Sequence, residues 1–238
     1  GCLSDYNVEL DTRHTMIELL NCDCMEYMAT VPDKYFDLSI VDPPYGLGET
    51  AIRAKQRVPN TQSVKWRNRR APDYKGSDNW DDTVPDKKYF DELLRISKNQ
   101  IIWGANHFGL MQPSSGWVVW YKKRFDEVND FSDAELAYTS FKKGCRLFHL
   151  PWIGFGAVNA KETRIHPTQK PVKLYEWLLT NYAKKGQRIL DTHLGSGSSA
   201  IAAHYFGVDF VGCELDKDYF EAAKARFDMA TRQLAMSI

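Results

Sequence analysis

Hydrophobic residues along this chain fall into short runs that alternate with stretches of helical periodicity. Five of the runs predict strands of a largely buried sheet, because such strands read as nearly continuous apolar segments. These predicted strands are residues 16–20, 38–41, 101–103, 188–190 and 210–213. Residues 117–121 and 134–139 predict a neighbouring antiparallel pair, whereas residues 144–159 give no assignment.

Helices are predicted between these strands. Apolar residues at helical spacing indicate helices over residues 24–29, 88–96, 198–206 and 216–234. A further helix is expected to begin at Pro171, with its apolar face formed by Val172, Leu174, Tyr175, Leu178, Leu179 and Tyr182. Alternation of strands and helices is typical of right-handed βαβ units, so the pattern predicts an α/β fold on a mainly parallel sheet.

The composition favours one main α/β domain with an inserted region. The chain has 238 residues, of which 43% are hydrophobic, and this is enough to bury one sizeable core. Lysine plus arginine equals aspartate plus glutamate at 31 each, so contact with a polyanion requires local clusters of charge. Five cysteines without a CxxC pair indicate neither disulfides nor a zinc site, and we expect a reducing, cytoplasmic setting. No long apolar run or signal-peptide pattern occurs, so we expect no membrane contact.

Asp42, Pro43, Pro44 and Tyr45 follow directly on the predicted strand 38–41. Open α/β sheets place their active sites at the carboxyl ends of such strands. Consecutive prolines donate no backbone hydrogen bonds, so the segment presents a carboxylate, free carbonyls and an aromatic ring. A planar base with an exocyclic amine suits this set, since Asp42 and the Pro43 carbonyl can accept its protons while Tyr45 stacks on the ring. The alternative is a turn that only ends the strand, with Tyr45 in the core.

A glycine-rich turn joins the predicted strand 188–190 to the helix 198–206. Gly195, Ser196 and Gly197 allow close approach of a ligand to a helix N-terminus. Glu214 ends the next strand, at the position where an acid holds ribose hydroxyls. Asp191 favours S-adenosylmethionine over a nicotinamide dinucleotide, because a carboxylate there repels pyrophosphate and attracts the methionine ammonium. A turn that serves only packing is the other alternative.

Basic residues gather in the long polar segment 46–82, where Asp73 is the sole acid between residues 53 and 75. Since this segment leaves the Asp42 strand directly, we expect a loop that closes on DNA, with a merely solvated loop as the alternative. Trp66 can fill the gap left by a base flipped out of the duplex. The predicted phosphate-binding residues are Arg53, Lys55, Lys65, Arg67, Arg69 and Arg70 in the loop, and Lys122, Lys123, Lys142 and Lys143 around the strand pair.

Taken in this order, the segments resemble the permuted β class of DNA amino-methyltransferases, over nearly the whole chain. Residues 21–23, 102–108, 129–137 and 166–171 extend the resemblance. It implies a Rossmann-like S-adenosylmethionine-dependent methyltransferase fold, with a twisted sheet, helices on both faces and a circularly permuted motif order. It also implies a single domain over residues 1–238, with an approximate target-recognition insertion at 110–165 and a cofactor-binding half at 166–238.

The same resemblance implies roles for individual residues. Asp23, next to Cys24, would receive the adenine amino group of the cofactor, while Thr168 and Lys170 would lie near its methionine and ribose. The sequence departs from the family at His193, which stands where an apolar phenylalanine usually lies against the methionine. It departs again at Asn21, which replaces the glycine of the family's Gly-Asp element.

The activity that the resemblance implies is methyl transfer from S-adenosylmethionine to the N6 amine of a flipped-out adenine in double-stranded DNA. Direct transfer needs neither a metal nor a covalent intermediate, and the Pro-Cys pair used for cytosine C5 methylation is absent from the sequence. Cytosine N4 methylation is the nearest alternative, because its target is also an exocyclic amine. More distant alternatives are a protein glutamine methyltransferase, a nicotinamide-dependent oxidoreductase and a DNA-binding module without catalysis. A second copy of the chain, in a homodimer, is a further expected partner.

Overall fold

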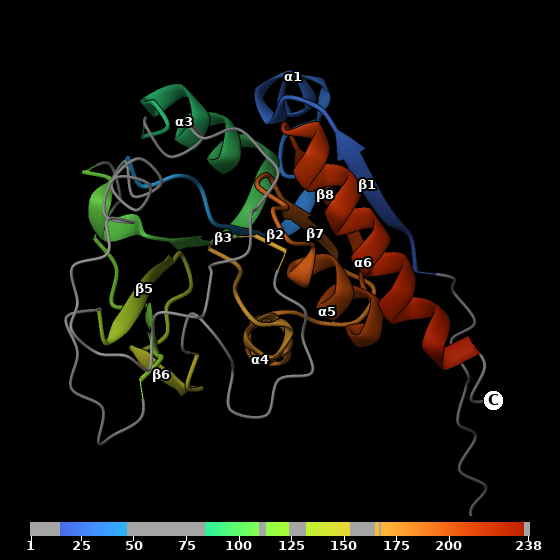
Figure 1. Ribbon diagram of the computed structural model, residues 1–238. Helices are drawn as coiled ribbons and strands as arrows, with labels where there is room; N and C mark the ends of the chain where they lie inside the picture. Colours follow the sequence, from blue (N-terminus) through green and yellow to red (C-terminus); the bar gives the residue numbers. More distant parts are fainter. Residues whose placement is uncertain are drawn as a thin grey trace, which may run out of the picture.

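The computed structural model describes residues 15–46, 84–109, 113–123, 132–152, 165–166 and 168–235. Within these ranges eight strands form one sheet, in the order β1-β8-β7-β2-β3-β5-β4-β6 (Figure 1). The strands are β1 (Ile17–Asn21), β2 (Phe36–Val41), β3 (Ser97–Trp103), β4 (Trp117–Tyr121), β5 (Ala134–Thr139), β6 (Arg146–His149), β7 (Arg188–Asp191) and β8 (Asp209–Glu214).

Parallel pairing joins β1, β8, β7, β2 and β3, while β5 runs antiparallel to both β3 and β4. The chain continues from β2 to its neighbour β3 on one side, and from β7 to its neighbour β8 on the other. Since β2 and β7 are themselves paired, the connections diverge at the carboxyl ends of these two central strands. Ligands of open α/β sheets bind at such a switch point.

Helices cover both faces of the sheet (Figure 1). Helices α1 (Cys24–Thr30) and α3 (Lys87–Ile96) pack on one face, while α4 (Val172–Tyr182) and α5 (Ser198–Phe206) pack on the other. The final helix, α6 (Lys217–Ala235), packs against α5 and β1, and a short 3-10 helix, η1 (Ala105–His107), follows β3. None of the helices in the described ranges has the length and apolar character to span a membrane.

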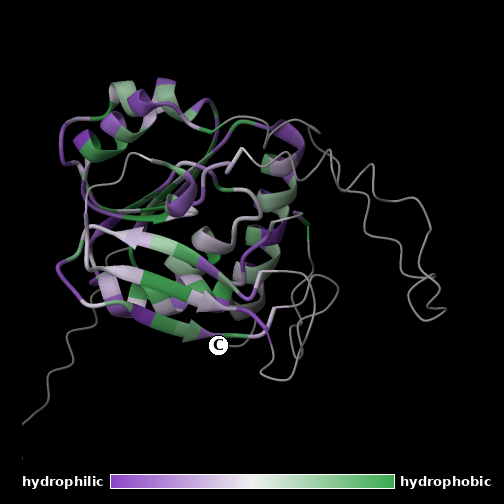
Figure 2. Cartoon of the chain, turned by 90° about the vertical axis from the view of Figure 1, so that its left-hand side faces the viewer, coloured by the Kyte–Doolittle hydropathy of each residue, from purple (hydrophilic) through white to green (hydrophobic). Residues whose placement is uncertain are grey.

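Alternating side chains on the central strands divide the core into two layers. Ile189 and Phe210 are buried with α4 and α5, whereas the next residues, Leu190 and Val211, are buried with α1 and α3. Figure 2 shows hydrophobic residues along the strands and hydrophilic residues on the outer turns of the helices. Burial on both sides explains why these short strands read as continuous apolar runs.

The structure confirms the α/β fold and the elements predicted from periodicity, with ends that differ by a few residues. The antiparallel pairing of β4 with β5 and the buried face of α4 are also confirmed, although Val172 is only partly buried. The sequence did not predict β6, because three of its four side chains are exposed. Strands β4, β5 and β6 of this sheet lie within residues 110–165, where a target-recognition insertion stays a prediction.

Candidate active site

Asp42 and Tyr45 lie directly after β2, at the switch point of the sheet. The Tyr45 hydroxyl donates a hydrogen bond of 2.6 Å to Asp42 Oδ1. Burial raises the pKa of Tyr45 well above its ordinary value, so the hydroxyl stays protonated and is held as a donor. The sequence placed both residues correctly at the end of the strand, and the structure adds the contact between them.

Gly104 and His107 fix the position of the Tyr45 ring. Gly104 has φ of +66°, and a Cβ atom built on it would lie 2.1 Å from Tyr45 Cε1. The His107 ring is stacked on Tyr45, with centroids 5.1 Å apart and an interplanar angle of 18°. The Tyr45 ring is therefore held against η1.

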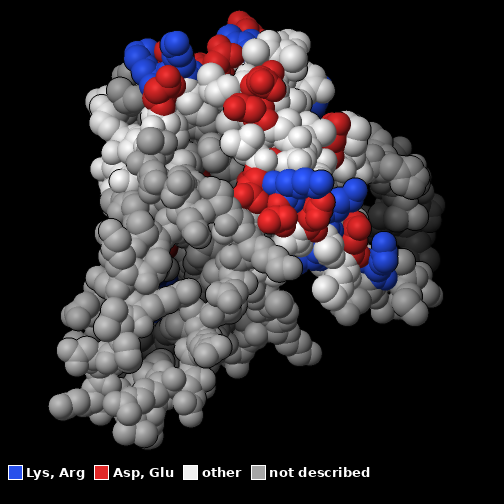
Figure 3. Space-filling model, turned by 45° about the horizontal axis from the view of Figure 1, so that its top comes forward, with Lys and Arg blue, Asp and Glu red and all other residues white. Residues whose placement is uncertain are grey.

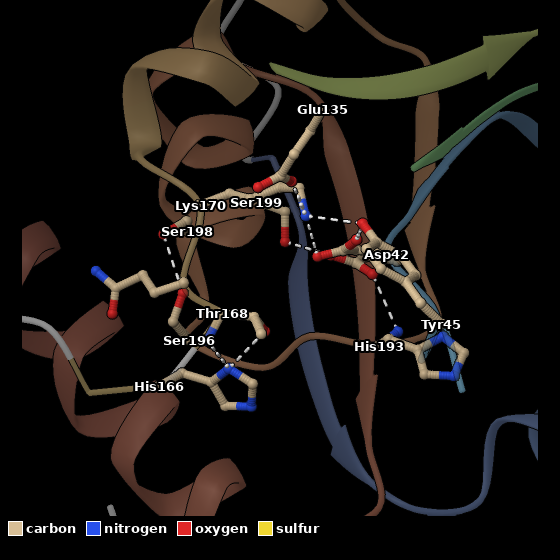
Figure 4. A network of polar contacts seen from close by, with 12 residues as sticks. Asp42, Tyr45, Glu135, His166, Thr168, Lys170, His193, Ser196, Ser198 and Ser199 are labelled. Atoms are coloured by element: carbon tan, nitrogen blue, oxygen red, sulfur yellow. Dashed lines mark hydrogen bonds and ion pairs between the residues drawn. The ribbon is translucent and has the colours of Figure 1, made fainter. Parts of the chain in front are cut away.

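Lys170 forms an ion pair with the second carboxylate oxygen of Asp42. Its ammonium lies 2.5 Å from Asp42 Oδ2, 3.1 Å from Glu135 Oε2 and 3.3 Å from the Tyr45 hydroxyl (Figure 4). The side chain is only 4% exposed, so these contacts replace most of its hydration. The resemblance implied a place for Lys170 near the cofactor's methionine and ribose, whereas the structure pairs it with the carboxylate of the predicted base site.

Glu135 also belongs to this cluster, although the sequence did not predict it as a site residue. It enters from β5, and Lys122 contacts its Oε1 at 2.8 Å while Lys170 contacts its Oε2. Burial opposes ionisation of Glu135, but the two ammonium groups outweigh it and lower the pKa of the carboxyl to about 2. A glutamate in a strand that is otherwise largely apolar was the one available signal for a buried ionic contact.

Burial also governs the protonation of Asp42. It raises the pKa of this carboxyl, and the nearby negative charge of Glu135 acts in the same direction, while Lys170 opposes both. Burial would likewise favour neutral Lys170, but the two carboxylates raise the pKa of its ammonium above the ordinary value. The arrangement thus keeps Lys170 charged between two acids that differ in their affinity for protons.

The glycine-rich turn follows β7 as predicted. Gly195 and Gly197 have φ of +52° and +73°, and Gly197 packs against the backbone of Ala223, which leaves little room for a side chain. Asp191 accepts hydrogen bonds from Ser199 Oγ at 2.6 Å and from the His193 amide at 3.0 Å. Burial raises the pKa of Asp191 to about 7, and the hydrogen bonds from these two neutral donors offset only part of that rise.

Glu214 and Asp23 stand at the same edge of the sheet as this turn, because β8 is paired with both β7 and β1. The Glu214 carboxylate accepts the amide protons of Gly195, at 2.8 Å, and Asp216, at 3.0 Å. Asp23 caps α1 by accepting the Met25 amide proton at 2.7 Å, with Cys24 half-buried beside it. All three predicted acids of the cofactor side are therefore bound by neutral donors and retain acceptor capacity for a ligand.

His193 packs as a neutral ring. Burial lowers the pKa of its imidazole to about 4, and its Nδ1 lies 2.9 Å from Thr192 Oγ1. Its ring meets Tyr89 edge to face, and the Tyr89 hydroxyl is 2.7 Å from the same Thr192 oxygen. The departure from the family's phenylalanine thus still supplies an uncharged aromatic surface near the turn.

Side chains before α4 and around the start of α5 extend the network in Figure 4. The Thr168 hydroxyl is 3.1 Å from His166 Nδ1, which also accepts the Thr168 amide proton. Ser196 and Ser198 are joined through their hydroxyls at 3.1 Å, and Arg226 donates to the Ser196 carbonyl at 2.7 Å. These contacts orient the backbone on the predicted methionine side of the cofactor site.

The predicted DNA-binding lysines divide into two kinds. Lys122 and Lys123 form ion pairs with Glu135 and Asp133, so they are bound within the domain. Lys143 donates to the Asn181 carbonyl and lies over the Tyr182 ring, while Lys142 is exposed.

The face in Figure 3 shows basic and acidic side chains of the described ranges next to one another, as in the ion pairs of α3. Arg53, Lys55, Lys65, Trp66, Arg67, Arg69 and Arg70 lie outside the described residues.

Comparison with known proteins shows what this chain is similar to. A sequence model described as DNA methylase matches residues 119–225. The type II methyltransferase M.ScaI of Streptomyces caespitosus is 23% identical, over 91% of this chain and 83% of its own. The structure of TTHA0409, a putative DNA modification methylase from Thermus thermophilus complexed with S-adenosyl-L-methionine, is 16% identical, with a TM-score of 0.55 over 91% of this chain and 94% of that one. The cytosine-N4-specific PvuII DNA methyltransferase is 12% identical, with a TM-score of 0.54 over 92% of each chain. These two structures share the fold described above.

Proposed function

We propose that this chain, whose residues 119–225 match the DNA methylase family, transfers the methyl group of S-adenosylmethionine to the N6 amine of adenine in DNA. The observation that carries the proposal is a largely buried carboxylate, Asp42, at the switch point of the sheet, with a glycine-rich turn and three further acids at or just after the ends of β7, β8 and β1. Adenine is preferred on the family resemblance of the Asp42–Tyr45 segment. Cytosine N4 is the second candidate, because its exocyclic amine likewise offers two protons, one for Asp42 and one for the Pro43 carbonyl.

The donor set of the cofactor side fits S-adenosylmethionine. This ligand presents an ammonium, a ribose diol and an adenine amine, and each of them is a partner for a carboxylate. In this proposal Asp191 holds the ammonium, Glu214 the ribose and Asp23 the adenine amine. When bound, the cofactor supplies a methyl group on a positively charged sulfur. His193 and the turn at Gly195 shape the wall of that site and exclude water from it.

Asp42 prepares the acceptor amine. The lone pair of an exocyclic amine is delocalised into the ring, and hydrogen bonds from both amine protons to Asp42 and the Pro43 carbonyl favour a pyramidal nitrogen with an available lone pair. Tyr45 orients the Asp42 carboxylate and stacks on the base. Alignment of the two reactants then supplies the main catalytic effect, which reaches roughly 7 to 11 kcal/mol in well-oriented systems.

The test is nucleoside analysis. Unmethylated genomic DNA is incubated with the protein and S-adenosylmethionine, digested to nucleosides and analysed by mass spectrometry. The proposal predicts N6-methyladenine in amounts that grow with time. N4-methylcytosine without N6-methyladenine would show that the target is the cytosine N4 amine. Formation of 5-methylcytosine alone would exclude both the adenine N6 and the cytosine N4 activity.

Cofactor affinity should increase as the pH rises from about 5.5 to about 7.5, because Asp191 must ionise to attract the methionine ammonium and its pKa is about 7. Asp191→Asn should abolish this dependence and weaken binding about ten-fold at the upper pH, whereas Asp228→Asn on α6 should behave as wild type. Folding raises the pKa of Asp191, so its ionisation costs stability as the pH rises, and the asparagine variant should be at least as stable as wild type above pH 7. Calorimetric titration and thermal unfolding measure the two effects.

Glu214→Ala should weaken S-adenosylmethionine binding by about 1.5 to 3 kcal/mol, through loss of charge-assisted hydrogen bonds to the ribose. Glu214→Gln should lose less, since an amide oxygen still accepts one of the amide protons that Gly195 and Asp216 donate. DNA affinity should change little in either variant. An unchanged cofactor affinity in Glu214→Ala would show that Glu214 does not bind the ribose.

A further inference from the structure

Both carboxylate oxygens of Asp42 already accept a hydrogen bond, and the proposed target amine must bind one of them. Tyr45 donates to Oδ1 at 2.6 Å and Lys170 contacts Oδ2 at 2.5 Å. An amine that binds Asp42 must therefore displace or share one of these donors. This inference rests on the proposed function, because it concerns how the same site admits its substrate.

Lys170 has a second carboxylate within reach. Glu135 Oε2 lies 3.1 Å from its ammonium, and the Trp103 ring lies below it with the centroid 5.4 Å away. An isolated ammonium in so buried a place would be costly, but Lys170 can leave Asp42 and remain paired with an anion. Glu135 is suited to this task because Lys122 holds its other oxygen at 2.8 Å.

We propose that Glu135 is a positioning residue of the target-amine site, which holds the Lys170 ammonium between two carboxylates and so controls how strongly it occupies Asp42. The base amine takes the place of the ammonium at Asp42 Oδ2, and Lys170 moves onto Glu135. No covalent bond is made or broken in this exchange. The charge of the cluster is unchanged throughout, since the two acids and Lys122 and Lys170 keep their protonation states.

Charged and titratable groups from several elements face these two acids. Lys170, Glu135 and Tyr45 act on Asp42. The charge of Asp42 in turn acts on Tyr89, Tyr175 and Asp191. Lys170, Lys122, Tyr45 and Tyr175 interact with Glu135. Removing the charge of Glu135 leaves Lys170 with Asp42 as its anionic partner in this cluster and also removes a like charge, so both effects lower the pKa of Asp42.

The test is a titration of the Asp42 carboxyl carbon by 13C NMR, with the resonance assigned by its loss in Asp42→Asn. Glu135→Gln should move the Asp42 midpoint to lower pH by about one unit, and Lys170→Gln should move it to higher pH. Glu135→Asp, which keeps the charge but is shorter, should give a smaller shift of the same sign as Glu135→Gln and serves if that variant folds poorly. Asp133→Asn, which breaks the neighbouring ion pair with Lys123, is the matched control and should leave the midpoint in place.

Single-turnover methyl transfer to DNA over the same pH range gives the second measurement. In Glu135→Gln the acidic limb of the pH–rate profile should shift to lower pH together with the titration midpoint of Asp42. The rate at the plateau of the profile should fall about ten-fold, because Lys170 remains paired with Asp42. In the Lys170→Gln background, the Glu135 substitution should have a smaller effect on the plateau. An Asp42 midpoint that is the same in wild type and folded Glu135→Gln would overturn the positioning role. Shifted midpoints in a protein that methylates no DNA would instead refute the proposed function.

Discussion

Asp42→Ala is expected to reduce methyl transfer to DNA at least a hundred-fold to a thousand-fold, the range typical for loss of one preorganised electrostatic contact. The variant should keep S-adenosylmethionine affinity, because the acids assigned to the cofactor lie on β7, β8 and the end of β1. It should also keep most of its DNA affinity, since phosphate contacts dominate the free energy of DNA binding. Single-turnover transfer of labelled methyl groups, normalised to the folded fraction, measures the effect.

Asp42→Asn is the control that separates chemistry from packing. The amide has nearly the same volume and can still accept from the Tyr45 hydroxyl, but it carries no charge to pair with Lys170. We expect a folded protein with a similarly large loss of transfer. If both variants transfer methyl groups at the wild-type rate, Asp42 only ends a strand and has no part in the reaction.

Gly104→Ala is expected to cost about a hundred-fold in methyl transfer, because misplacement of a catalytic contact by about 1 Å has effects of this size. The new methyl group would overlap the Tyr45 ring, and the residue would also be strained at φ of +66°. Tyr45 would then move away from both His107 and Asp42. Pre-steady-state transfer and cofactor titration should show a loss of rate with cofactor affinity preserved.

Gly144→Ala provides the matched substitution, since a Cβ atom at Gly144 meets nothing within 4 Å. Its transfer rate and thermal stability should remain close to wild type. Equal rates for Gly104→Ala and Gly144→Ala would mean that the position of Tyr45 does not matter to the reaction.

The sequence predicted the central part of the fold well because the relevant signals are local. Continuous apolar runs identify β7 and β8, and glycines followed by a helical pattern identify the turn before α5. Strand β6 escaped prediction because its exposed residues show no alternation, and its place is set by pairing with β4. Element ends differ because caps such as Asp86, which accepts the Tyr89 amide proton, decide them.

The polar network of the site was harder to predict, because its contacts join distant parts of the chain. Lys170 and Asp42 are 128 residues apart in sequence, and their pairing follows from the approach of the α4 connection to the end of β2. Glu135 joins them only because β5 lies beside β3 in the sheet. No spacing rule contains this information, although the residue types were all visible in the sequence.

The central claim is that the site around Asp42 transfers a methyl group from S-adenosylmethionine to an amine of DNA. The most direct measurement mixes excess protein with duplex DNA and S-adenosylmethionine that carries a deuterated methyl group, stops the reaction within one turnover, and separates DNA from protein before mass spectrometry. We predict that the intact deuterated methyl group appears on the N6 amine of adenine in wild type and is strongly reduced in Asp42→Ala. Label found in protein but absent from DNA, or equal label in DNA from both proteins, would contradict the account.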